Sequence, residues 1–181
     1  MPIKEIRTRL QSIGLALACA SGTAAVPAFA LEKKLPTGDP CTVVPLAVVQ
    51  KSFPDAKAAL RDRSVEKYGL TRCRYNDASG VSVFAVTESS GKYSALEEAQ
   101  SPMPQAKGVR YEKLSGLAPE AVAFVELADP KRGIPSDISM LVMKKGERIL
   151  ELESQDLPKR GRAAALKVLD ELGRIAAKRL E

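Results

Sequence analysis

The sequence contains no histidine. Histidine is the commonest general base near neutral pH and the commonest metal ligand in proteins. Its absence excludes Ser-His-Asp and Cys-His catalysis and every zinc site that includes a histidine. Tryptophan is absent as well, which leaves tyrosine as the ring for stacking on a sugar. We predict no metal site, no cofactor and no catalytic residue.

Motifs for nucleotide and nucleic-acid binding are also missing. Gly91-Lys92 lacks the upstream glycine and the following Ser or Thr of a phosphate-binding loop. Residues 64–67 fit S-x-x-K, but the partner motifs of penicillin-recognising enzymes do not occur. Basic residues are scattered and aromatic residues make up only 4% of the chain, so we predict no nucleic-acid binding.

Residues 1–30 have the three parts of a cleaved signal peptide. The first residues are basic, no charge follows between positions 10 and 29, and the stretch closes on Ala-Phe-Ala at 28–30. Polar residues, glycines and a proline interrupt the apolar run, which therefore falls short of the roughly 20 apolar residues of a transmembrane helix. We expect cleavage after Ala30, export to the periplasm or the extracellular space, and no transmembrane segment after cleavage.

The alternative to cleavage after Ala30 is a lipid anchor at Cys19. The preceding residues Ala16, Leu17 and Ala18 resemble a bacterial lipobox, which usually has a large aliphatic residue three positions before the cysteine and a small one two before it. Here the two stand in the reverse order, which favours cleavage after Ala30.

Removal of residues 1–30 leaves two cysteines, Cys41 and Cys73. Two cysteines in an exported domain most simply form one disulfide. They are not in a C-x-x-C pair and no histidine is available to complete a metal site. We therefore predict a structural disulfide between them.

The rest of the chain divides into a polar lead-in and one domain. Residues 31–40 are rich in lysine, proline and glycine and predict a flexible lead-in. Residues 41–181 are enough for one hydrophobic core. Without residues 1–30 the chain has 25 Lys and Arg against 21 Asp and Glu, a net charge of +4. This mild positive charge suits a protein among anionic envelope polymers.

Hydrophobic periodicity predicts an α+β domain with an antiparallel sheet of five to six strands. Short helices are expected at 46–53 and 93–100, while 56–68 is helix-capable but crowded with charge. The expected strands are 70–75, 81–87, 109–114, 121–127, 138–143 and 148–153. The strand at 81–87 is apolar on both faces, which predicts a central position in the sheet.

The last predicted element is a long amphipathic helix at about 158–180. Its apolar residues, Leu169 and Leu172 among them, fall on one side of a 3.6-residue helix, and its charged residues fall on the other. The apolar side has no aromatic ring of the kind that interfacial membrane helices use. We predict that this helix packs on the sheet.

The order of these features resembles a group of small exported bacterial domains of unknown function. The resemblance rests on Asp39-Pro40-Cys41 before a short helix, Cys73 on a strand, and the amphipathic terminal helix. Many members of the group are lipoproteins, and some share a PsbP-like α/β/α sandwich. The resemblance implies such a sandwich here and carries over no functional residue.

The loop 129–137 is the best candidate for recognition. It holds Lys131 and Arg132 beside the apolar Ile134, between turn-forming residues, and binding residues concentrate on loops held by a scaffold. The alternative is a long hairpin connection without a binding role.

Two further sets of residues have functional alternatives. Tyr93 and Tyr111, which follow Lys92 and Arg110, form either an aromatic and basic patch or ordinary packing. Glu151 and Glu153, on the same face of one predicted strand, resemble an acid–base pair or a calcium site, but a solvated sheet face has the same pattern.

The combined expectation is a non-catalytic exported domain that binds a partner protein or an anionic envelope component. Its expected contacts are Lys131, Arg132 and Ile134. The alternative is a histidine-free enzyme that uses carboxylates such as Glu151 and Glu153 on envelope glycans.

Overall fold

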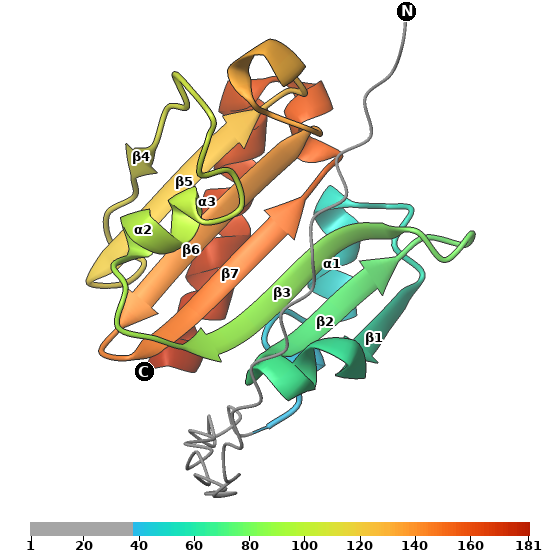
Figure 1. The fold of residues 1–181 in the computed structure, drawn as a ribbon. Coiled ribbons are helices and arrows are strands. Elements are labelled where there is room, and N and C mark those ends of the chain that lie inside the picture. The colour runs from blue at the N-terminus through green and yellow to red at the C-terminus, as the bar shows by residue number, and fades with distance from the viewer. Residues whose placement is uncertain (1–37) are drawn as a thin grey trace, which may run out of the picture. The chain divides into compact units, whose positions relative to one another are not determined.

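Seven antiparallel strands form one sheet in residues 38–181, the part of the chain that the computed structural model describes. The strands are β1 (Ala58–Asp62), β2 (Thr71–Asn76), β3 (Ser82–Ser90), β4 (Glu112–Lys113), β5 (Glu120–Glu126), β6 (Ile138–Lys145) and β7 (Arg148–Ser154). Their order across the sheet is β1-β2-β3-β7-β6-β5-β4 (Figure 1). The predicted α+β class is confirmed, with one strand more than expected.

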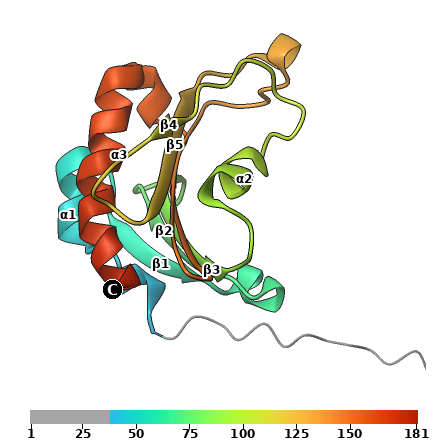
Figure 2. The ribbon, with the colours of Figure 1, turned by 90° about the vertical axis from the view of Figure 1, so that its left-hand side faces the viewer.

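Helices cover both faces of the sheet. Helices α1 (Leu46–Ser52) and α3 (Arg162–Ala176) lie on one face, and the short helix α2 (Ala95–Gln100) lies on the other (Figure 2). The larger core lies between the sheet and α3, where Leu152 and Leu169 are fully buried. A smaller core lies beneath α2 and includes the fully buried Phe124. The three layers follow from strands that are apolar on both sides.

Several predictions concern residues outside the described part of the chain. These predictions are the signal peptide at 1–30, the alternative lipid anchor at Cys19, and most of the lead-in at 31–40. Within residues 38–181 no helix is both long enough and apolar enough to cross a membrane.

The additional strand is β1, in the charged stretch 56–68 that the sequence marks as helix-capable. Strand β1 is an edge strand that pairs with β2 from Ala58 opposite Asn76 to Asp62 opposite Arg72. The Asp62 carboxylate then accepts a hydrogen bond from the backbone N–H of Ser64 at 3.0 Å and caps a 3₁₀ helix, Arg63–Tyr68. The stretch therefore divides into an edge strand and one helical turn, because pairing with β2 outweighs its local helix preference.

A disulfide joins Cys41 and Cys73, whose Cα atoms are 5.0 Å apart. Cys41 lies in the 3₁₀ helix Pro40–Thr42, and Cys73 is fully buried on β2. The hydroxyl of Tyr75, two residues further along β2, donates to the backbone carbonyl of Val44. Together these bonds tie the start of the described chain to the sheet.

Helix α3 packs tightly against the sheet at Gly173. A Cβ atom placed there would lie 2.5 Å from the Leu141 side chain on β6, so glycine is required by the contact despite its cost of about 1 kcal/mol in helix propensity. The predicted helix at 158–180 is shorter in the structure, because 3₁₀ turns form at Leu157–Arg160 and at Ala177–Leu180.

Replacing Leu169 with alanine should lower the melting temperature by roughly 5–15 °C, because truncating a buried leucine costs about 2–5 kcal/mol. Leu169 is fully buried against the sheet. Lys178→Ala, at an exposed position near the C-terminus, is the control and should change the melting temperature little. Thermal unfolding followed by circular dichroism measures both. A Leu169→Ala variant as stable as the parent would contradict packing of α3 on the sheet.

Candidate functional site

The loop that follows β5 does not present its three predicted contact residues together. Lys131 is exposed, whereas Ile134 is fully buried. The guanidinium of Arg132 donates to the backbone carbonyl oxygens of Lys107 at 3.0 Å and Gly108 at 2.8 Å. Arg132 therefore braces a second loop, and Ile134 is a core residue. The prediction that Ile134 contacts a partner is corrected on this point.

Two backbone hydrogen bonds explain why Ile134 turns inward. The N–H of Asp129 donates to the carbonyl of Ile134 at 2.9 Å, and the N–H of Ile134 donates back at 3.0 Å. The closed loop directs the side chain into the smaller core, which also includes Met103 and Phe124. Burying an isoleucine stabilises a fold by about 1.5–3 kcal/mol. A single apolar residue in a polar loop can therefore hold the loop on the core as readily as it can contact a partner.

The carboxylate of Glu126, at the end of β5, connects three separate segments. Its side chain is only 9% exposed, and one oxygen lies 3.1 Å from Nη1 of Arg132. The other oxygen accepts a hydrogen bond from the backbone N–H of Arg110 at 3.3 Å and lies 3.9 Å from Nη1 of Arg162. These contacts hold the loop 101–111, the turn at Pro130–Arg132 and the start of α3 against one another.

Helix α2 is fixed to the sheet by polar contacts at its N-terminus. Ser94 and Glu97 form a capping box, in which the Ser94 N–H donates to the Glu97 carboxylate at 2.7 Å and the Glu97 N–H donates to the Ser94 hydroxyl at 3.2 Å. The Glu120 carboxylate on β5 accepts the first N–H of the helix at 3.0 Å. Lys144 on β6 donates to the backbone carbonyl of Tyr93. These contacts therefore fix α2 and the backbone of Tyr93 to the sheet.

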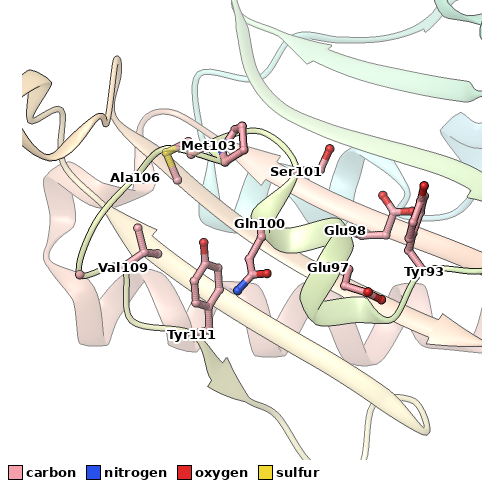
Figure 3. Close-up of a pocket in the computed structure, with 11 residues that line it drawn as sticks. Tyr93, Glu97, Glu98, Gln100, Ser101, Met103, Ala106, Val109 and Tyr111 are labelled. Carbon is pink, nitrogen blue, oxygen red and sulfur yellow. The ribbon is translucent and has the colours of Figure 1, made fainter.

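An open hollow of about 630 Å³ lies between α2 and the loop that follows it (Figure 3). Its lining residues are Tyr93, Glu97, Glu98, Gln100, Ser101, Met103, Pro104, Ala106, Gly108, Val109 and Tyr111. We call it the tyrosine hollow. Tyr93 and Glu98 lie toward one end of it, and Tyr111 and Gln100 lie toward the other (Figure 3). Its volume is in the range of sites for small ligands or side chains.

The tyrosine hollow is acidic. Glu97 and Glu98 are its charged lining residues, and no lysine or arginine of the described chain lines it. Hydrogen bonds from the backbone and the hydroxyl of Ser94 lower the pKa of Glu97 below its usual range. Glu97 is therefore ionised at neutral pH.

The structure brings both predicted tyrosines to this hollow, but in different roles. Tyr93 is 65% exposed. Tyr111 packs edge-on against Phe124 with ring centroids 5.4 Å apart, and burial raises the pKa of its phenol. Lys92 and Arg110 do not line the hollow, so the tyrosines are accompanied there by carboxylates. Ordinary packing therefore describes Tyr111, whereas Tyr93 is exposed and lies beside carboxylates, not in the aromatic and basic patch that was the alternative.

The acidic pair Glu151 and Glu153 lies on the α2 side of β7, and both residues are half-buried. Burial, and to a smaller extent the charges of Glu98 and Glu153, raise the pKa of Glu151 to about 7, and the charge of Arg72 opposes this shift. Arg72 is held on β2 by a hydrogen bond of 2.8 Å to the Thr87 hydroxyl. This face of β7 is therefore less solvated than the alternation of the sequence suggests.

Among residues 38–181, no group of three or more Asp, Glu or Cys side chains is arranged to hold a metal ion. The residues that line the tyrosine hollow but were not singled out in the sequence are mainly Glu97, Glu98 and Met103. In the sequence, this region is marked by the spacing of Ser94 and Glu97, which is the signature of a helix start. The hollow itself arises from the packing of the following loop.

Comparison of the chain with protein-family models, with curated proteins and with solved structures finds no match. The geometry of the tyrosine hollow and its charges are therefore the basis for assigning a function.

Glu151→Gln should stabilise the protein at neutral pH but not in acid. The pKa of Glu151 rises from 4.5 to about 7 on folding, so between these values the folded state binds more protons than the unfolded state. The free energy of unfolding then falls as pH rises, by up to about 1.4 kcal/mol per pH unit. Glutamine does not ionise and removes this loss.

Urea unfolding at a series of pH values measures the effect. The variant and the parent should be equally stable near pH 4, and the variant should be more stable by about 1–3 kcal/mol near pH 8. Glu147→Gln, in the exposed turn between β6 and β7, is the matched control. A constant difference between Glu151→Gln and the parent at every pH would contradict the shifted pKa.

Proposed function

We propose that this protein is an exported, non-catalytic binding domain that holds a basic segment of a partner protein in the tyrosine hollow. The observation that carries the proposal is an open hollow whose charged lining consists of Glu97 and Glu98, beside the exposed ring of Tyr93. Lysine and arginine side chains pair with carboxylates and lie favourably over tyrosine rings. The hollow combines both kinds of contact.

The net charge of the chain makes this local acidity informative. Without residues 1–30 the chain carries +4, so it has no general attraction for basic partners. The two carboxylates of the hollow reverse that sign locally, and their positions are set by α2. A basic segment would therefore be recognised at this place on the surface and repelled by most others.

The hollow is also pre-organised. The capping box of Ser94 and Glu97, the Glu120 carboxylate and the Lys144 ammonium fix α2 and Tyr93 before any ligand arrives. Arg132 fixes the opposite loop through the carbonyls of Lys107 and Gly108. A site with rigid walls loses less conformational entropy on binding.

The first test uses two short blocked peptides, one of arginines and one of glutamates, titrated into the protein and followed by NMR. The arginine peptide should shift the signals of Tyr93, Glu98 and their neighbours in a saturable way, and the glutamate peptide should not. Glu98→Gln and Tyr93→Ala should each weaken the arginine peptide about two- to fivefold, as expected for exposed ion pairs and cation–π contacts.

Tyr68→Ala is the matched control, because Tyr68 is 62% exposed on another part of the chain. It should leave the affinity unchanged. Equal binding of both peptides, or an equal loss of affinity in Tyr68→Ala, would contradict the proposal. A photo-crosslinking residue at position 93, compared with one at position 68, then identifies the partner in exported material.

The alternative function is a histidine-free enzyme acting on envelope glycans, and the near-neutral pKa of Glu151 favours it. A general acid needs a pKa near the working pH, and Glu153 lies two residues away on the same side of β7. Release of reducing sugars from purified envelope polysaccharide should then occur with the parent and be lost in Glu151→Gln. No release by the parent would exclude this alternative for the polysaccharide used.

A further inference from the structure

Another hollow, of about 400 Å³, lies where the start of α2 faces β4 and the beginning of β5. We call it the leucine hollow. The proposed function assigns no ligand to it. More than half of its lining residues are apolar, and these are Leu96, Leu114, Pro119, Ala121 and Val122.

The leucine hollow has no net charge. Its charged lining residues are one cation, Lys113, and one carboxylate, Glu120. The Glu120 carboxylate already accepts the N–H of Ala95 at 3.0 Å. In α2, Ala95 and Ala99 are fully buried against the sheet, whereas Leu96 is 37% exposed. The hollow therefore offers an apolar contact to a neutral side chain and no net attraction to a basic one.

The leucine hollow adjoins the tyrosine hollow along two walls. On α2, Leu96 lines the leucine hollow, and Gln100 lines the tyrosine hollow about 6 Å further along the same face of the helix. On the opposite wall, Lys113 lines the leucine hollow, and Tyr111 lines the tyrosine hollow about 7 Å away along an extended chain. Both of these residues lie on the α2 side of the sheet. The two hollows are therefore successive parts of one groove.

The length of this step matches an extended peptide. Side chains at positions i and i+2 of an extended chain point to the same side and are about 7 Å apart, so one such pair can place a side chain in each hollow. The tyrosine hollow has Glu97 and Glu98 as its charged lining residues, and it suits the long side chain of a lysine or arginine. The neutral leucine hollow suits an apolar side chain. The charges of the two hollows therefore set which residue enters which hollow.

We propose that the leucine hollow binds an aliphatic side chain of the same partner segment, two residues from the lysine or arginine in the tyrosine hollow. This inference rests on the proposed function and names the class of segment: an extended chain with a basic and an aliphatic residue at alternate positions. The aliphatic side chain covers the exposed part of Leu96, and removing both apolar surfaces from water favours binding.

The test uses two blocked five-residue peptides with a central arginine. One peptide has leucine at both ends, two residues from the arginine in either chain direction, and the other has serine at these positions. The parent protein should bind the leucine peptide about five- to tenfold more tightly, as expected when a leucine side chain is partly buried. In NMR titrations, the methyl signals of Leu96 should shift with the leucine peptide alone, and the signals of Tyr93 should shift with both peptides.

Leu96→Gln should remove the preference for the leucine peptide and bind the serine peptide as the parent does. Glutamine is a good helix former, so α2 is kept while the apolar surface is lost. Leu60→Gln is the matched control, because Leu60 is 51% exposed on β1, at the opposite edge of the sheet. This variant should keep the preference.

Equal affinity of the parent for the two peptides, or an unchanged preference in Leu96→Gln, would overturn this inference. An equal loss of the preference in Leu60→Gln would do so as well. The proposed function would survive these results, because the serine peptide reports the arginine in the tyrosine hollow separately. Binding of neither peptide would overturn the proposed function and this inference together, so the two failures are distinguishable.

Discussion

The buried carboxylate of Glu126 is the interaction that holds the loop wall of the tyrosine hollow in place. Its bonds to Arg132 and to the backbone of Arg110, with Arg162 close by, join three segments that are far apart in the sequence. Because the Glu126 side chain is only 9% exposed, loss of these partners would leave a poorly solvated carboxylate without compensation. The loop 101–111 is therefore held by polar contacts more than by apolar packing, since Met103 is its only buried residue.

This arrangement separates charges of opposite sign within a short distance along the chain. Gly108 lines the tyrosine hollow, where Glu97 and Glu98 lie, and it also lines a second hollow, where Arg110, Arg132 and Arg162 lie. Arg132 maintains this separation of charges, because its bonds to the carbonyls of Lys107 and Gly108 keep its guanidinium outside the tyrosine hollow.

Much of the fold could be predicted from periodicity, and the exception has a physical reason. Alternating or continuous apolar residues marked six strands, because burial against a core leaves that pattern in the sequence. Strand β1 has no such pattern: its residues Ala58–Asp62 are half-buried or exposed at the sheet edge. Its backbone hydrogen bonds to β2 hold it there, and any sequence without proline can make those bonds. The predicted terminal helix was too long because Gly161, with φ of +86°, interrupts it at its start.

The candidate site was less predictable because its residues acquire their roles only through contacts between distant segments. The composition of the loop 129–137 is typical of a recognition loop. The same residues also occur where an arginine supports a neighbouring loop and an isoleucine packs in the core, and the local sequence does not distinguish the two cases. The contacts of each side chain decide between these cases. Arg132 binds Lys107, Gly108 and Glu126, and Ile134 packs in the core under α2. Tyr93 shows the converse. Its basic sequence neighbour Lys92 suggested one kind of ligand. The side chains beside it in space are the carboxylates of α2, and these determine which charge it can help to bind.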